Sequence, residues 1–558
     1  MPSNGEEGID AVDGVLIANA RTFRRLAVFS IVVYLIVVFA LFANIKRRNA
    51  GHFTYALDDP YIHLALAENI AHGHYGLNPQ EYSSPSSSIL WPILLVPFVS
   101  TKFHPYLPLL WNILFGSVAA ALIAWTVDRY PPQQDEHGAM NWWKQAVTCV
   151  LLIFVANLPS LTLLGMEHTL QVLLAIGCAI GVIEALRGRP IPIWCLVAAV
   201  LSPAVRYEGL ALTVAVCIAL WGQRSWKKAA VVFGLSLAPL IAFSVFLREH
   251  GLPVLPMSVL VKGNVYQNPD TLRRIANMFK AGFSSAVSEP MRYAMVVFFF
   301  TFIGLAWSAR TRERRFALWG VTLAAGAHLL IGRFGWFFRY EVYMLIFLTL
   351  VCMKILAEGR AFLFGFFALA LTFVAAPFLY ATRMTSAAAS EVYYQQYQMH
   401  RFVAGFYNGN YAVNDIGWVS YQRTSGAYVL DVFGLASVEA SQQRSKTAAW
   451  LDDVTRRHDV GLAMLYPTWF PHLPREWTPL ASLCLQHPPI VEGAKCVMFY
   501  STSPAENAEI TGDLQRFALT MPKNSGFKLI VAGIAGTTRE PGQLEGDSAG
   551  PSTWQTVP

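Results

Sequence analysis

The chain has 558 residues, 54% of them hydrophobic and 14% charged, and its formal net charge is +7. Soluble domains carry roughly 25% charged residues, so this composition excludes an ordinary soluble protein. The basic residues lie mostly in short loops between apolar segments, which favours orientation in a membrane over binding of nucleic acid. We therefore expect a polytopic α-helical membrane protein with membrane lipids, and no nucleic acid, among its partners.

The first 20 residues are polar, and we expect them to be disordered and cytoplasmic. The apolar segment 26–43 is long for the core of a signal peptide and lacks a small-residue cleavage site, so we interpret it as a retained first span. Further apolar segments extend a membrane module over residues 21–380 and predict about 11–12 spans. These segments are 105–127, 144–161, 166–186, 191–205, 208–222, 229–247, 291–308, 315–331, 340–357 and 361–379.

Three basic clusters between these segments predict the orientation of the chain. Counted span by span, 187–189, 224–228 and 310–315 fall on the side of the N-terminus, which the positive-inside rule makes cytoplasmic. The apolar segment 87–99 is short and contains two prolines, and as a span it would move all three clusters outside. We interpret it as interfacial or re-entrant. The chain is then expected in the cytoplasmic (inner) membrane, with everything after about residue 380 outside.

The region 390–535 changes character, because short buried strands there alternate with an amphipathic helix. This pattern predicts a small extracytoplasmic α/β domain. Outside the cytoplasm, Cys484 and Cys496 are expected to form a disulfide. Residues 536–558 are rich in Gly, Ser, Thr and Pro and are expected to form a disordered tail. The strands are predicted in "YAVNDIG", "AYVLDVFGL" and "VGLAMLYPTW", and the helix in "TAAWLDDVTRRH".

The first outer loop, predicted over 46–100, contains two adjacent carboxylates, Asp58 and Asp59. Because Pro60 follows, Asp59 is a good helix start, and helix capping alone accounts for it but not for Asp58. A fixed acid near the membrane boundary can instead take a proton from a hydroxyl acceptor or hold a divalent cation near a phosphate. His63, one turn later, either assists this chemistry or faces the surface and the lipid headgroups.

Four basic residues lie at the predicted outer ends of later spans, on the same face as this acidic pair. Such residues bind an anionic lipid phosphate through charge-assisted hydrogen bonds. The alternative is that each extends into the headgroup region without a specific ligand. Glu167 and Glu208 are expected either to orient these basic side chains or to cap helices. The four basic residues are Arg206, Lys262, Arg333 and Arg339.

Several short motifs occur in an order that resembles the GT-C superfamily of membrane glycosyltransferases. The similarity is to the bacterial branch with arabinofuranosyltransferases, aminoarabinose transferases and relatives of protein mannosyltransferases. It runs from roughly residue 20 to 470, with His168 and Tyr207 in place of the Thr and Pro that the family motifs carry. The motifs are the acidic pair after the first span, "GHYGLNPQEYSSPSSSILW", "LLGMEHTL", "VRYEG", "LPVLPMSVLVKGN" and "VNDIGWVSYQRTSGAYVLDVFGLAS".

This resemblance implies transfer of a hexosyl or pentosyl unit, with inversion, from a polyprenyl-phosphate sugar donor to a cell-envelope glycan, lipid or protein. Asp58 would be the general base and Asp59 its helper or a metal-oriented partner. Asp58 is also the candidate ligand of a divalent cation, Mg²⁺ or Mn²⁺. Arg206, Lys262 and Arg339 would bind the lipid phosphate, and Arg333 joins them by its position. Candidates for substrate binding are His63, Glu81, Tyr82, Glu167, Glu208, Tyr340 and Asp415.

Two alternative functions fit parts of the sequence. A transporter or flippase of lipid-linked sugars would account for charges and broken helices in the membrane, although transporters often have two matching halves and this chain has no internal repeat. A non-enzymatic scaffold would bind a partner through its outer domain and would not need Asp58 or Asp59. Asp415 also has a second interpretation, as part of a structural turn.

Overall fold

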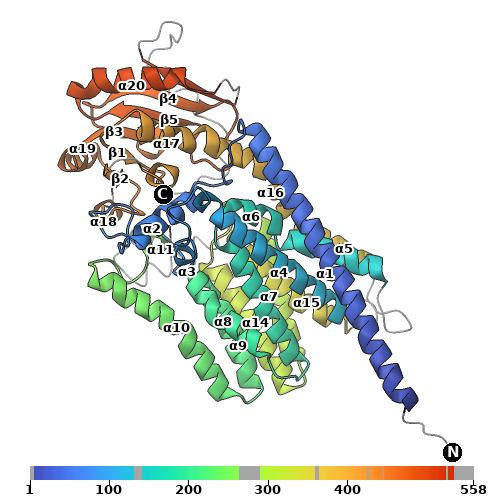
Figure 1. The fold of residues 1–558 in the computed structure, drawn as a ribbon. Coiled ribbons are helices and arrows are strands. Elements are labelled where there is room, and N and C mark those ends of the chain that lie inside the picture. The colour runs from blue at the N-terminus through green and yellow to red at the C-terminus, as the bar shows by residue number, and fades with distance from the viewer. Residues whose placement is uncertain are drawn as a thin grey trace, which may run out of the picture.

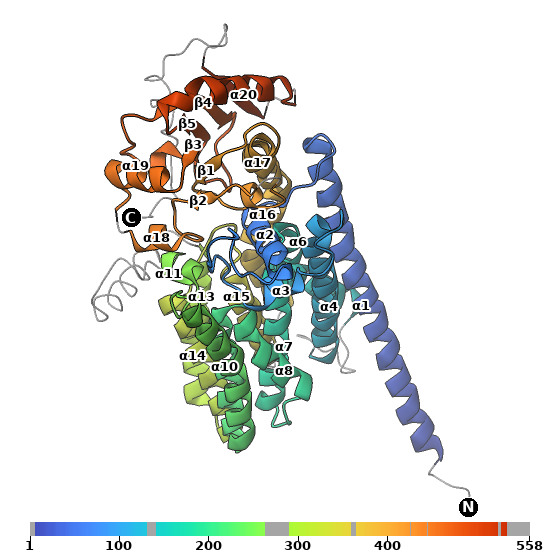
Figure 2. The same ribbon diagram turned by 60° about the vertical axis from the view of Figure 1, so that its left-hand side comes forward.

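A bundle of long helices carries an α/β domain at one end (Figure 1). The short helices α2 (Asp59–Ala71), α3 (Leu90–Leu94) and α11 (Met257–Lys262) lie at this end, between the bundle and the domain (Figures 1 and 2). We call this region the junction. The computed structural model describes residues 6–130, 141–262, 290–358, 364–423, 426–443, 445–522 and 526–532.

Every predicted span is helical. In the described ranges, seven helices are long and apolar enough to cross a membrane, and three shorter apolar helices accompany them, so the chain is a multi-pass membrane protein. The seven are α1 (Glu6–Arg48), α4 (Leu107–Arg129), α5 (Trp142–Val155) together with α6 (Leu158–Leu164), α7 (His168–Leu186), α10 (Trp226–Glu249), α13 (Pro290–Ser308) and α16 (Phe364–Tyr394). The three shorter ones are α8 (Ile193–Val205), α9 (Leu210–Gly222) and α15 (Val342–Leu356). Helix α14 (Arg312–Ile331), from the predicted span 315–331, belongs to neither group.

Three boundaries differ from the prediction. Helix α1 begins at Glu6, inside the segment predicted to be disordered, because "DAVDGVLIANARTF" combines Ala, Leu and Ile with few helix breakers. The predicted span 144–161 is divided into α5 and α6 at Asn157, which has a left-handed φ of 49° and is followed two residues later by Pro159. Helix α16 continues past residue 380 to Tyr394. The predicted tail 536–558 lies outside the described residues.

Segment 87–99 contains only the five-residue helix α3. Pro92 lies inside this helix, and Pro97 stops its continuation. At 1.5 Å per residue, five residues cover about 8 Å, far less than the thickness of a bilayer. The segment therefore does not span, as predicted.

The α/β domain is built on a six-stranded mixed sheet with strand order β2-β1-β3-β5-β4-β6. The three predicted strands, β1, β2 and β3, are parallel neighbours. The other three are antiparallel and were not predicted individually. Helix α19 (Ala448–Arg457), which was predicted, packs on β3, and α20 (Asn507–Leu519) packs on β4 and β6. The strands are β1 (Asn410–Val413), β2 (Val429–Asp431), β3 (Val460–Leu465), β4 (Thr478–Leu485), β5 (Cys496–Ser501) and β6 (Phe527–Val531).

The predicted disulfide is confirmed. Cys484 on β4 and Cys496 on β5 pair directly across the two strands and are bonded to each other. The bond closes the connection 485–495 at its base. It therefore limits the movement of a segment that, as described below, reaches back to the bundle.

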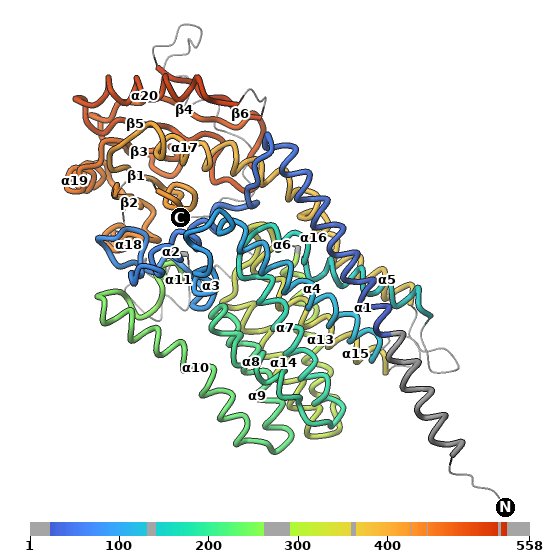
Figure 3. The backbone as a smooth tube through the Cα atoms, viewed as in Figure 1, coloured from blue at the N-terminus to red at the C-terminus, as the bar shows by residue number. Residues whose placement is uncertain are grey.

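Helices α1 and α16 pack along each other, and both lead into the junction (Figure 3). Helix α1 continues into the loop that carries Asp58, and α16 continues through α17 (Gln396–Gly405) into β1. The α/β domain also docks on the predicted first outer loop, because the Asn78 side chain pairs with the backbone N–H and C=O of Val429. The predicted first outer loop and the α/β domain are therefore in direct contact.

Candidate active site

The two adjacent acids lie at the start of α2, but neither caps this helix with its side chain. Asp58 occupies the N-cap position without a side-chain capping hydrogen bond, and Asp59 is the first helical residue, followed by Pro60. The alternative interpretation of Asp59, that its side chain only caps α2, is therefore wrong. The physical reason is that both carboxylates are engaged by groups distant in sequence.

Asp58 is held by the α/β domain. Its Oδ2 accepts a hydrogen bond from the Gly417 N–H at 2.7 Å, and its Oδ1 accepts one from the Trp418 N–H at 2.9 Å. Burial raises the pKa of Asp58 to about 8, and the nearby charge of Asp415 adds to this effect, although the two N–H groups oppose it. A carboxyl group with a pKa near neutrality, fixed between two modules, has the properties of a general base.

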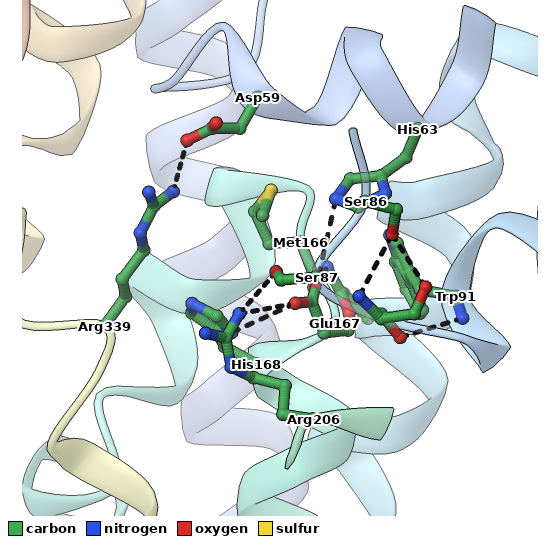
Figure 4. A network of polar contacts seen from close by, with 12 residues as sticks. Asp59, His63, Ser86, Ser87, Trp91, Met166, Glu167, His168, Arg206 and Arg339 are labelled. Atoms are coloured by element: carbon green, nitrogen blue, oxygen red, sulfur yellow. Dashed lines mark hydrogen bonds and ion pairs between the residues drawn. The ribbon is translucent and has the colours of Figure 1, made fainter. Parts of the chain in front are cut away.

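Asp59 is instead paired with the bundle. Its Oδ2 accepts a hydrogen bond from Arg339 Nη1 at 2.7 Å (Figure 4). The Arg339 side chain is 2% exposed and also donates to the Tyr340 hydroxyl at 2.9 Å. The charge of Asp59 is therefore compensated, whereas Asp58 has no basic partner among the hydrogen bonds and ion pairs of the described residues.

The segment before Arg339 has an unusual backbone. Gly335, Trp336, Phe337 and Phe338 all have positive φ values, of 79°, 43°, 64° and 56°. Left-handed conformations cost roughly 1–2 kcal/mol for each residue other than glycine, so this turn is strained. It directs Arg339 into the junction, toward Asp59.

A second ion-pair network lies behind the first. Arg206 donates to Glu167 at 2.7 Å and to the Ser87 hydroxyl at 3.1 Å (Figure 4). It also donates to Glu208 at 3.0 Å. It follows α8, where Pro203 and the extended backbone of Arg206 end the helix. The network joins the predicted re-entrant segment to the N-cap of α7, where Glu167 lies, and to the 3-10 turn before α9, which contains Glu208. Arg206 is therefore neutralised by two acids.

His63 and His168 border this network. His63 Nε2 lies 3.7 Å from Glu167 Oε2, and His168 Nδ1 lies 3.9 Å from Glu167 Oε1. All three side chains are almost completely buried. Glu167 Oε2 and both ring nitrogens of His168 have no hydrogen-bond partner in the described part of the chain. In neutral His168 one ring nitrogen is a hydrogen-bond donor and the other an acceptor, so this histidine and Glu167 Oε2 can contact a polar ligand.

The remaining predicted site residues take different positions. Glu81 binds the α/β domain, through the Tyr428 hydroxyl at 2.6 Å and the Val438 N–H at 3.2 Å. Tyr82 packs between His74 and His250. Arg333 is exposed and contacts the Tyr340 ring. Lys262 ends α11, and its side chain lies outside the described part of the structure.

Three residues that the sequence did not single out surround Asp415. Gln396 Nε2 donates to Asp415 at 3.2 Å and to the Tyr466 hydroxyl at 3.0 Å. Tyr466 in turn donates to Glu492 at 3.1 Å. The residues come from α17, the end of β3 and the disulfide-closed connection, up to 96 positions apart. Only the two cysteines that flank Glu492 could have drawn attention to it.

A divalent cation was predicted at Asp58. The described residues form no group of three His, Cys, Asp or Glu side chains spaced to hold a metal ion. Both Asp58 oxygens accept backbone N–H groups, and Asp59 is paired with a cation already. Glu167 Oε2 and the His168 ring lack hydrogen-bond partners among the described residues, but Glu167 already pairs with the Arg206 guanidinium, so these two side chains do not fit a cation either.

The fold is similar to that of a known enzyme. The crystal structure of the Archaeoglobus fulgidus oligosaccharyltransferase, in complex with Zn and sulfate, has a TM-score of 0.50 at 11% identity, over 86% of this chain and 73% of that one. A structure of the same enzyme, AglB, with an inhibitory peptide and a dolichol-phosphate has a TM-score of 0.45 at 11% identity, over 77% of this chain and 69% of that one. The oligosaccharyltransferase has a GT-C fold, and the first likeness shows that this chain has it too.

Part of the α/β domain also matches a family model. Residues 387–500 match a family model described as a domain of unknown function, DUF8728. No curated protein matches the chain. The family match covers most of the α/β domain and the end of α16, and so includes Asp415, Gln396 and Glu492.

Proposed function

We propose that this protein is a membrane glycosyltransferase that moves a sugar from a polyprenyl-phosphate donor to an acceptor hydroxyl, with Asp58 as the general base. One observation supports this most directly. The Asp58 carboxylate is fixed by two backbone N–H groups at the junction and has no basic partner among the described residues, beside arginines that are paired and buried. A scaffold would have no need of an acid held in this way.

The reaction follows from the groups present. The acceptor oxygen attacks the anomeric carbon from the side opposite the phosphate, the bond from that carbon to the phosphate oxygen breaks, and the configuration inverts. The hydroxyl proton passes to Asp58, and the electron pair of the broken bond leaves with the polyprenyl phosphate. A base with a pKa near 8 is well matched to proton transfer at neutral pH.

The arginines have unequal roles in binding the leaving phosphate. Arg206 already faces Glu167 and Glu208, so it chiefly organises the site. Arg339 shares its charge with Asp59 and keeps donors available, and exposed Arg333 lies against the same Tyr340 ring. We assign the phosphate to Arg333 and Arg339.

The disulfide supports an extracytoplasmic location for the α/β domain and therefore for Asp58. This agrees with the orientation that the basic clusters predict, in a cytoplasmic membrane with the active site facing outward. We include in this proposal that the sugar is a hexosyl or pentosyl unit and that the chain belongs to the bacterial branch of the superfamily. An envelope glycan, lipid or protein is the acceptor class that this location makes available.

The test is turnover of a panel of polyprenyl-phosphate sugars by the purified protein. Wild type and Asp58→Asn are compared for release of polyprenyl phosphate and for sugar transfer. We expect turnover of at least one donor by the wild type and its loss in the variant, with donor binding retained. Movement of labelled lipid across liposomes without turnover would favour a flippase, and no binding of any donor would overturn the proposal.

A further inference from the structure

The connection 485–495, between β4 and β5, is held at its base and at its tip. At its base the Cys484–Cys496 disulfide closes it. At its tip, Glu391 of α16 accepts hydrogen bonds from the Ile490 N–H at 2.8 Å and the Val491 N–H at 2.9 Å. Glu391 is completely buried. The bundle and the disulfide therefore fix the next residue, Glu492, from two sides.

Glu492 faces the residues around Asp415. Its carboxylate accepts hydrogen bonds from the Tyr466 hydroxyl and from Gln396 Nε2, and the same Nε2 reaches Asp415. Asp415 is two residues before Gly417, whose N–H holds Asp58. The group formed by Asp415, Gln396 and Glu492 therefore adjoins the proposed base directly.

Gln396 has an unused atom at this position. Its side chain is 1% exposed, yet its Oε1 has no hydrogen-bond partner in the described part of the chain. Because the amide is planar and its nitrogen lies among the two carboxylates, its oxygen borders the same group. A buried carbonyl oxygen without a hydrogen bond is unfavourable, so a ligand that donates to Gln396 Oε1 would stabilise this group.

Aromatic side chains around Trp469 lie beside these polar groups. Trp469 is half-buried and packs against Tyr466, with ring centroids 5.3 Å apart, and against Phe433 at the same separation. Its ring lies over Gly493, where an added Cβ would overlap with it. Glu492, Asp415 and Trp469 are each partly exposed, so a ligand can reach them from solvent.

We propose that Asp415, Gln396 and Glu492 form the acceptor subsite and that the acceptor is a sugar, bound through its hydroxyl groups. Gln396 Oε1 can only accept a hydrogen bond, whereas the two carboxyl groups accept or donate with their protonation, so hydroxyl groups, which do both, suit this subsite, and a sugar brings several adjacent ones. The C–H face of a sugar ring suits the apolar face of Trp469. This inference rests on the proposed function, since it supplies the hydroxyl that Asp58 activates.

The electrostatics of the group agree with a ligand of this kind. Burial raises the pKa of Glu492 well above its usual range, and the charges of Asp415, Glu391 and Asp58 raise it further. Arg339 is occupied by Asp59, His487 lies against Glu391 and not against Glu492, and Lys495 is exposed. Hydroxyl donors would stabilise the ionised carboxylates that the site otherwise disfavours.

Acceptor kinetics test the assignment in the full-length protein. Wild type, Glu492→Gln and Glu509→Gln, an exposed acid on α20, are compared for sugar transfer to methyl glycosides of glucose, mannose, galactose and arabinose, and to glucosamine and a serine-containing peptide. We expect the KM for at least one glycoside to rise tenfold or more in Glu492→Gln, with a smaller change in the KM for the sugar donor. Glu492→Asp should recover part of the loss, and Glu509→Gln should match the wild type.

Binding gives a readout that does not require turnover. Saturation-transfer NMR with the same glycosides should show signals for wild type and Glu509→Gln, reduced fivefold or more in Glu492→Gln. Equal signals in all three proteins, or transfer to the peptide alone, would overturn the sugar subsite. Sugar transfer only to glucosamine would keep the subsite and restrict it to amino sugars. Normal glycoside binding without turnover of any sugar donor would instead overturn the proposed enzyme.

Discussion

Asp58 and Asp59 are neighbours in sequence and opposites in environment. Asp59 turns to the bundle and forms an ion pair with Arg339, so its charge is compensated by a partner from the same module. Asp58 turns to the α/β domain, and within the described ranges it accepts hydrogen bonds from neutral N–H groups alone. Two adjacent carboxylates can therefore serve different purposes, because their surroundings decide which one stays ionised without cost and which one exchanges a proton.

The same division extends across the junction. On the bundle side, the acids Asp59, Glu167 and Glu208 face Arg339 and Arg206. On the domain side, Asp415 and Glu492 adjoin Asp58, and two neutral groups, the Gln396 amide and the Tyr466 hydroxyl, donate to them. The balanced half is suited to hold an anionic phosphate, and the unbalanced half is suited to accept protons and to bind hydroxyl groups.

The sharpest test of this division changes each acid to its amide. Asp58→Asn removes the proposed base, and a general base contributes 10²–10⁴-fold, so we expect kcat to fall by about 10³. Asp59→Asn keeps the base but leaves buried Arg339 without a counter-charge, so we expect about tenfold in kcat and about 2 kcal/mol in the free energy of unfolding. Turnover of a polyprenyl-phosphate sugar and thermal unfolding in detergent measure both. Equal losses of kcat would remove the distinction between the two acids.

Asp58 can also be displaced without changing its carboxyl group. A Cβ at Gly417 would overlap with the backbone oxygen and the carboxyl carbon of Asp58, so Gly417→Ala must move the acid away from its two N–H groups. We expect kcat to fall by about 10², since positioning of a reacting group contributes several kcal/mol. Gly426→Ala is the matched control, because a Cβ there meets nothing within 4 Å. If Gly417→Ala retained wild-type kcat, the contact between the domain and Asp58 would have no part in the reaction.

The bundle side of the junction, where acids and arginines are paired, was easier to predict from sequence than the domain side. Spans follow from local apolar runs, and the ends of spans bring Arg206, Arg339 and Asp59 to one face once the topology is known. The three parallel strands follow from buried runs next to turn residues. The disulfide could be predicted once the domain was placed outside the cytoplasm, and the structure confirms it.

The domain side depends on contacts that no local pattern encodes. Gln396 and Glu492 are 96 residues apart and meet only because α16 is longer than its apolar core and the β4–β5 connection folds back on it. Strands β4, β5 and β6 carry polar and charged residues among the apolar ones, which obscured their pattern. The left-handed turn at 335–338 is set by packing, since aromatic residues do not favour that conformation.

The pH dependence of activity examines the unbalanced half directly. Since the pKa of Asp58 is raised to about 8, the base is protonated at lower pH, and we expect kcat/KM to rise with pH to a plateau above about 8. Asp415→Asn removes a neighbouring negative charge and therefore lowers the pKa of Asp58, which should move the profile about one unit toward lower pH. Asp453→Asn, an exposed acid of α19, is the control. A profile that stays in place in Asp415→Asn would mean that the two carboxyl groups do not interact.

The smallest effect is expected in the balanced half, at the turn that positions Arg339. Gly335 has a φ of 79°, so Gly335→Ala adds about 1 kcal/mol of strain and should lower the free energy of unfolding by that amount. Because Arg339 follows this turn, the KM for the sugar donor should rise about threefold, a shift of well under 1 kcal/mol. Gly304→Ala, inside α13 with open space around its Cβ, should instead stabilise the protein through helix propensity. Opposite signs for the two variants would establish that the turn is held in a strained conformation; a stabilised Gly335→Ala would mean that the turn relaxes without moving Arg339, and that the phosphate side of the junction does not depend on it.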